Sequence, residues 1–126
     1  MEASSGLTIT ASTSFDSVLN GTADVDRLMI AGGPGSSAAM KDPDLIAFVR
    51  AMAPRVRRVA AICAGALILA EAGLLNGRRA STHWFWCPTL RDDYPQVTVD
   101  ADAIHVRDGN VWTSAGVTSG MDLALA

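Results

Sequence analysis

The residue of this chain that is best suited to do chemistry is Cys63, in the segment Ala-Ala-Ile-Cys-Ala-Gly-Ala at residues 60–66. An apolar run precedes it and a helix-forming run follows, as in a nucleophile elbow, a sharp strand-to-helix turn that presents one side chain. Such a turn crowds the strand against the helix, so the positions two before and two after must be small. They are Ala61 and Gly65. A thiol at a helix start also lies near unpaired N–H groups and the positive end of the helix dipole, which favour thiolate.

The alternative for Cys63 is a structural role, because a buried cysteine behaves as a small apolar side chain. Composition alone favours that alternative. The strand–Cys–x–Gly–helix context favours a reactive thiol, and this is the interpretation we carry forward.

Groups that could stabilise an anion lie near the same predicted sheet edge. Gly32–Gly33 ends a strand-like run and could offer a bare backbone N–H, while the N–H of Ala64 could supply a second donor. His83 ends the run after the elbow helix, at the carboxyl edge where ligands bind to parallel sheets. Glycines at strand ends are common in loops, and a lone histidine is more often structural. The prediction of a site beside Cys63 rests on finding the two N–H donors and His83 at the same predicted sheet edge.

A parallel sheet is needed to bring these residues together. Two continuous apolar runs, residues 27–31 and 58–62, predict strands that are covered on both faces. We expect further short strands at residues 7–10, 80–83, 97–99, 104–106 and 111–113, and helices at 15–19, 42–53, 64–75, 85–91 and 118–126. Strands that alternate with helices predict an α/β fold, an open and mostly parallel sheet with helices on both faces.

Composition bounds the function classes. The chain has 126 residues, 49% of them hydrophobic, and a formal net charge of −3, so it is one domain without a basic stripe for nucleic acid. It opens without a signal peptide and has no apolar run long enough to span a bilayer, which predicts a cytoplasmic protein without membrane contact. Its two cysteines and two histidines lie in no recognised ligand spacing, so we expect no metal, no cofactor and no Cys63–Cys87 bridge.

Three short phrases carry a resemblance to a known family: Ala-Gly-Gly at 31–33, Ile-Cys-Ala-Gly at 62–65 and Ser-Thr-His at 81–83. With them the chain resembles the ThiJ/PfpI superfamily, which has the class I glutamine amidotransferase-like, flavodoxin-like fold. Within it, the phrases at 70–80, 82–84 and 113–118 most resemble the amino-terminal domain of AraC-type transcriptional regulators.

The resemblance implies roles for particular residues. Cys63 would be the reactive thiol with His83 close to it, and the candidate ligand-binding residues are Gly32, Gly33, Ala64, Trp84 and Gly116. It also implies a small-molecule ligand, a homodimer, and DNA binding only through a helix-turn-helix domain that is absent from residues 1–126. The chain looks like a partial domain that lacks the usual amino-terminal strand and helix, where the family carries the acidic partner of the cysteine.

Three functions stay open. The first is a ligand-sensing domain of a regulator, favoured by the phrase at 112–117 and by Ala64, which stands where family peptidases have His and isonitrile hydratases have Thr. The second is an isonitrile hydratase-like or amidohydrolase-like cysteine enzyme. The third is a structural dimerisation module.

Overall fold

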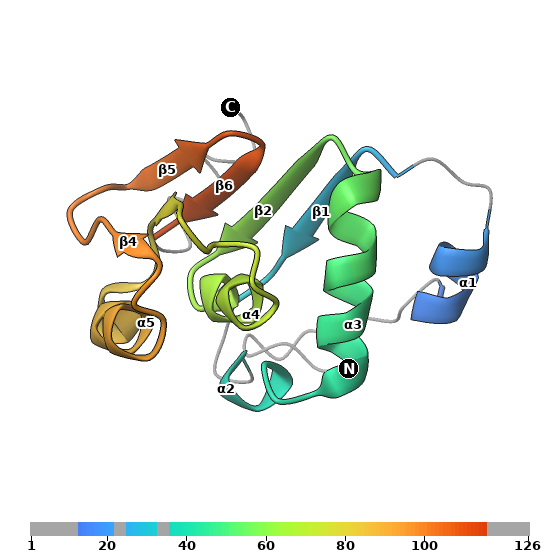
Figure 1. The fold of residues 1–126 in the computed structure, drawn as a ribbon, viewed down its shortest axis with the longest axis horizontal. Helices are drawn as coiled ribbons and strands as arrows, with labels where there is room; N and C mark the ends of the chain where they lie inside the picture. Colours follow the sequence, from blue (N-terminus) through green and yellow to red (C-terminus); the bar gives the residue numbers. More distant parts are fainter. Residues whose placement is uncertain (1–12, 22–24, 33–35, 116–126) are drawn as a thin grey trace, which may run out of the picture.

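The computed structural model describes residues 13–21, 25–32 and 36–115. Its main sheet has the strand order β1-β2-β6-β5, with β1, β2 and β6 parallel and β5 antiparallel (Figure 1). A second, parallel sheet pairs β3 with β4. The strands are β1 (Arg27–Ile30), β2 (Arg58–Ile62), β3 (Arg79–Ala80), β4 (Thr98–Val99), β5 (His105–Asp108) and β6 (Val111–Ser114). The predicted open, mostly parallel sheet is confirmed, whereas the strand predicted at 7–10 lies outside the described residues.

Two helices, α3 and α4, lie across one face of the main sheet (Figure 1). The helices are α1 (Phe15–Asn20), α2 (Ser36–Ala39), α3 (Pro43–Met52), α4 (Gly65–Glu71) and α5 (Cys87–Asp93), with the 3₁₀ turns η1 (Ala53–Arg55) and η2 (Trp84–Trp86). The helix predicted at 118–126 also lies outside the described part. No helix in the described ranges is long and apolar enough to cross a membrane.

The core fills the space between this sheet face and the two helices. Ile30, Val59 and Val111 face it from three strands, and Val49 and Leu67 are fully buried on α3 and α4. Because successive residues of a strand point to opposite faces, these strand residues share one face of the sheet. This packing fixes β2 and α4, the two elements that flank Cys63.

The helix α3 begins where the sequence predicted it. The Asp42 side chain accepts a hydrogen bond from the N–H of Asp44 at 3.0 Å, and Pro43 takes the first helical position.

The helix α4 is shorter than the predicted range 64–75 and ends at Glu71. Gly73 takes the left-handed φ of 81°. Its N–H donates to Ala70 and that of Leu74 to Leu69, both at 3.0 Å, which is a Schellman ending. The helix therefore stops at this glycine and not at Asn76–Gly77.

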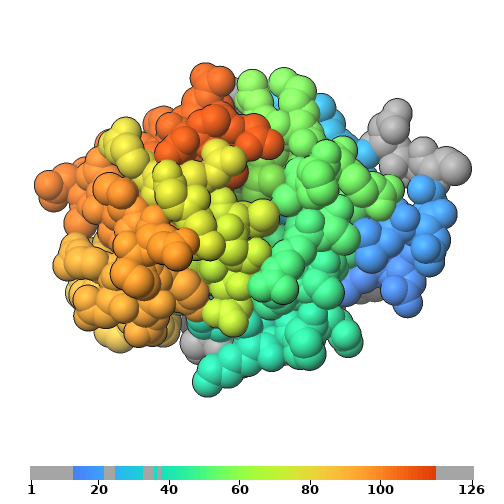
Figure 2. Space-filling view, in the orientation of Figure 1, coloured from blue at the N-terminus to red at the C-terminus, as the bar shows by residue number. Residues whose placement is uncertain are grey.

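The helix α1 is attached to the rest by few contacts. Figure 2 shows it in blue at one edge of the molecule, against the green of α3. The rings of Phe15 and Phe48 stack at 4.3 Å, and no residue of α1 is fully buried.

Candidate functional site

The turn from β2 into α4, residues 62–65, is called the Cys63 turn below. Cys63 has a φ of 56°, and it is the one non-glycine residue with positive φ in the described ranges. That conformation costs about 1 kcal/mol or more, so the surroundings must hold it. The N–H of Cys63 donates to the carbonyl oxygen of Ser114 at 3.0 Å, which extends the pairing of β2 with β6. The chain thus turns sharply at the cysteine and enters the helix two residues later.

Two glycines, Gly65 and Gly32, lie so close to backbone atoms at this turn that neither position has room for a side chain. A Cβ at Gly65 would lie 2.7 Å from the carbonyl oxygen of Ile30. A Cβ at Gly32 would lie 2.5 Å from the carbonyl oxygen of Ile62 and 2.8 Å from the nitrogen of Ala64. As the sequence predicted, position 65 must be small, and Gly32 is brought directly against the turn.

The thiol of Cys63 is free and half-buried. The N–H of Ala64, on the next peptide, has no acceptor among the described residues. A thiol therefore stands next to a backbone donor that the described residues leave without an acceptor, an arrangement suited to anion or carbonyl-oxygen binding.

His83 is brought to the neighbourhood of the Cys63 turn by the residue before it. The hydroxyl of Thr82 donates to the carbonyl oxygen of Cys63 at 2.7 Å. The His83 ring turns to its own chain, where Nδ1 accepts the N–H of Phe85 at 3.3 Å. Within the described part of the chain no hydrogen bond joins the Cys63 sulfur to His83. Sequence reasoning missed Thr82, although its place in the Ser-Thr-His phrase, at the end of a short strand, was a usable signal.

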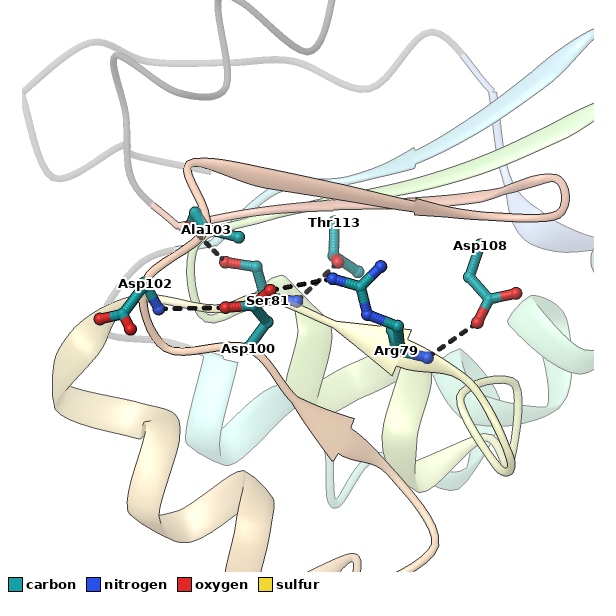
Figure 3. Close-up of polar contacts among 7 residues, drawn as sticks. All are labelled: Arg79, Ser81, Asp100, Asp102, Ala103, Asp108 and Thr113. Atoms are coloured by element: carbon teal, nitrogen blue, oxygen red, sulfur yellow. Dashed lines mark hydrogen bonds and ion pairs between the residues drawn. The ribbon is translucent and has the colours of Figure 1, made fainter.

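The segment that carries Thr82 and His83 is fastened to the main sheet by polar contacts, drawn in Figure 3. The N–H of Ser81 donates to the Thr113 hydroxyl at 2.8 Å, and the Ser81 hydroxyl donates to the carbonyl oxygen of Ala103 at 3.1 Å. The N–H of Arg79 donates to the Asp108 carboxylate at 2.8 Å. Residues 79–81, together with the residues that these bonds reach, are called the β3 junction below.

Cys87 lies under the same segment, at the start of α5. Its buried sulfur donates weakly to the carbonyl oxygens of Thr82 and His83, at 3.8 and 3.7 Å. Burial raises the pKa of this thiol, and the charge of nearby Arg91 opposes the shift to a smaller extent. Both cysteines are free thiols.

The remaining predicted site residues divide into two groups. Gly32 contacts the Cys63 turn, and Trp84 is 74% exposed with its ring 5.5 Å from that of His83. Gly33 and Gly116 lie outside the described residues. Among the described side chains, no three of His, Cys, Asp or Glu gather closely enough to hold a metal ion.

Known proteins similar to this chain include an enzyme and a regulator. Isonitrile hydratase from Pseudomonas putida is 36% identical over 125 residues, which cover 97% of this chain and 50% of the hydratase. HTH-type transcriptional regulator GbdR from Pseudomonas aeruginosa is 35% identical over 123 residues, 98% of this chain and 32% of the regulator. The chain therefore spans half or less of these relatives.

A solved structure and a family profile agree with these relatives. The crystal structure of a ThiJ/PfpI family protein from Pseudomonas syringae superposes with a TM-score of 0.83 at 34% identity, over 98% of this chain and 49% of that one. The profile of the DJ-1/PfpI family matches residues 1–126. The predicted superfamily and its kinship with transcriptional regulators are thereby confirmed, and the chain belongs to the DJ-1/PfpI family.

Proposed function

We propose that this chain is the ligand-sensing domain of an AraC-type transcriptional regulator and that it binds a small polar molecule beside Cys63. The observation that carries the proposal is the left-handed Cys63 at a strand-to-helix turn, with a half-buried free thiol. The similarity to the regulator GbdR, over 98% of this chain, supports a sensing role. DNA binding, by this proposal, belongs to a separate helix-turn-helix domain, and the regulator works in the cytoplasm as a homodimer.

The chemistry of the proposed ligand follows from the donors around the thiol. The N–H of Ala64 is open among the described groups, and the N–H of Gly33 is proposed as its companion. Two backbone donors beside a thiol suit a carbonyl oxygen, a nitrile nitrogen or a small anion. Trp84 and Gly116 are proposed to line the remainder of the pocket.

Binding without turnover is supported by the hydrogen bond that His83 makes. Because Nδ1 accepts the N–H of Phe85, a neutral imidazole carries its proton on Nε2. In that tautomer the ring can donate to a ligand but does not take the proton of Cys63, as a general base must. No carboxylate among the described residues is hydrogen-bonded to the ring to orient it as in a catalytic triad.

The second candidate function is a cysteine-dependent hydratase or amidohydrolase. It is favoured by the 36% identity to isonitrile hydratase over 97% of this chain. In that function Cys63 would be the nucleophile or the acid–base group, and His83 would rearrange to accept its proton.

The deciding experiment offers isonitriles, amides and small aldehydes to the purified chain and follows both binding and product. A sensor shows saturable binding without product, lost in Cys63→Ala and kept in the matched variant Cys87→Ala. Steady product formation that Cys63→Ala abolishes would establish the enzyme instead. If Cys63→Ala binds the ligand as the wild type does, the binding site is not at this turn.

A further inference from the structure

Thr82 contacts the Cys63 turn through a buried side chain that no role above explains. It is 2% exposed, and its hydroxyl lies 2.7 Å from the carbonyl oxygen of Cys63. We propose that Thr82 is a positioning residue for this site: it fixes the Cys63–Ala64 peptide, and through it the direction of the Ala64 N–H and of the thiol.

The peptide plane couples the carbonyl of Cys63 to the N–H of Ala64. The described chain contains no cis peptide, and in a trans peptide the C=O and the N–H point in opposite directions. Holding the carbonyl of Cys63 toward Thr82 therefore directs the N–H of Ala64 away from Thr82. The Thr82 hydroxyl thus determines the direction in which the N–H of Ala64 points.

Gly32 lies against the nitrogen end of the same peptide. A Cβ there would approach the nitrogen of Ala64 and the Cβ of Cys63 to 2.8 Å each. The peptide is held between a hydrogen bond from Thr82 and the bare backbone of Gly32. Close packing alone limits how far the peptide can rotate, while the hydrogen bond selects one orientation.

Thr82 can do this because its own position is fixed. Its neighbour Ser81 is bonded through both its N–H and its hydroxyl, to Thr113 and Ala103 (Figure 3). The carbonyl oxygen of Thr82 accepts a weak hydrogen bond from the thiol of buried Cys87, at 3.8 Å. A β-branched side chain has few χ1 rotamers, so a fixed backbone also fixes the hydroxyl.

The inference deepens the proposed function and rests on it only in taking the Ala64 N–H and the thiol as the groups that meet a ligand. Its test needs no ligand. Failure to find one would count against the proposed function alone, whereas the result below decides the role of Thr82.

The sequence offers a probe for this one peptide. The two cysteines are followed by Ala64 and Pro88, so Cys63–Ala64 is the one Cys–Ala pair in the chain. Protein labelled with carbonyl-¹³C cysteine and ¹⁵N alanine gives a single amide–carbonyl cross-peak that reports the C=O of Cys63 and the N–H of Ala64 together. The variants are Thr82→Val, which removes the hydroxyl at nearly constant shape, and Thr82→Ser, which restores it. The matched control is Thr98→Val, the same substitution at an exposed position on β4, which leaves the hydrogen bonds of Ser81 intact.

We expect Thr82→Val to move this cross-peak in its carbonyl and amide dimensions, and Thr82→Ser to return it close to the wild-type position. Alkylation of Cys63 by iodoacetamide should slow by about threefold to tenfold in Thr82→Val, the range that one hydrogen bond contributes, and recover in Thr82→Ser. Thr98→Val should leave both the cross-peak and the rate near their wild-type values.

The wild-type chain gives a measurement that does not depend on a variant folding. A buried hydroxyl exchanges slowly, so in mixed H₂O and D₂O the Cys63 carbonyl signal should split by the isotope effect of the bond from Thr82. An unsplit signal, a Thr82→Val protein with the wild-type cross-peak or alkylation rate, or a Thr98→Val protein with the same changes as Thr82→Val would overturn the proposal.

Discussion

The Cys63 turn and the β3 junction meet at Thr82, yet they are held together by different means. The turn is fixed by backbone against backbone, where Gly65 and Gly32 leave no room for a Cβ. The junction is fixed by separate hydrogen bonds that each join a backbone group to a side chain, such as that from the Ser81 N–H to the Thr113 hydroxyl. An atom added where backbones are in contact forces the backbone to move. A substitution in the junction removes one hydrogen bond and leaves the others in place. The two regions should therefore differ in how strongly single substitutions affect them.

The largest effect is expected for Gly65→Val. Its Cβ would lie 2.7 Å from the carbonyl oxygen of Ile30, an atom of the backbone that cannot turn aside. Overpacking of this kind costs about 3 kcal/mol at the upper end of its usual range. We expect the free energy of unfolding, from urea titration, to fall by about that amount.

Gly77→Ala separates steric overlap from backbone strain. Gly77 has a φ of 74° and nothing within 4 Å of an added Cβ, so its substitution tests conformation alone. It should cost about 1 kcal/mol. An effect of Gly65→Val no greater than that of Gly77→Ala would mean that the turn yields to an added side chain.

The second prediction concerns the β3 junction. Thr113→Val leaves the N–H of Ser81 without its partner, and both residues are 1% exposed. An orphaned buried donor costs about 1–3 kcal/mol, so we expect a loss of about 2 kcal/mol in the same titration. Thr98→Val, at an exposed position on β4, is the control and should change little. A loss as small as in this control would show that water or a rearranged backbone replaces the bond.

The comparison also shows what the sequence could and could not predict. Cys63 and Gly65 follow local rules, because strand, turn and helix are consecutive in the chain, and their arrangement was predictable. The β3 junction joins Ser81 to Thr113, and no local pattern pairs residues that far apart. For the same reason the strands were found singly while their order, with β2 beside β6, was not. Thr82 follows the β3 junction and links it to the Cys63 turn through a hydrogen bond between distant residues, which is why motif reading centred on Cys63 and His83 passed over it.

The third prediction compares the two thiols, Cys63 in the turn and Cys87 at the start of α5. Cys87 is 4% exposed, and burial raises its pKa, whereas Cys63 is half-buried on a turn. Because thiolate is the reacting form and a buried group reacts only after local opening, iodoacetamide should label Cys63 at least about tenfold faster at neutral pH. Mass spectrometry of timed samples measures both rates. Cys87 labelled first would mean that α5 opens more readily than the turn.

The smallest effect is expected from the ion pair at the rim of the β3 junction. Arg79 and Asp100 lie 2.9 Å apart, but their side chains are 59% and 33% exposed, so solvent screens the pair. A double-mutant cycle with Arg79→Met and Asp100→Asn should give a coupling below about 1 kcal/mol, decreasing as salt is added. The backbone N–H of Arg79, which donates to Asp108, is untouched by these changes, so β3 keeps its attachment. If the coupling equals the loss in Thr113→Val and resists salt, charge pairing and not the buried hydroxyls holds the segment that carries Thr82 and His83. The position of these residues beside Cys63 would then depend on the Arg79–Asp100 pair.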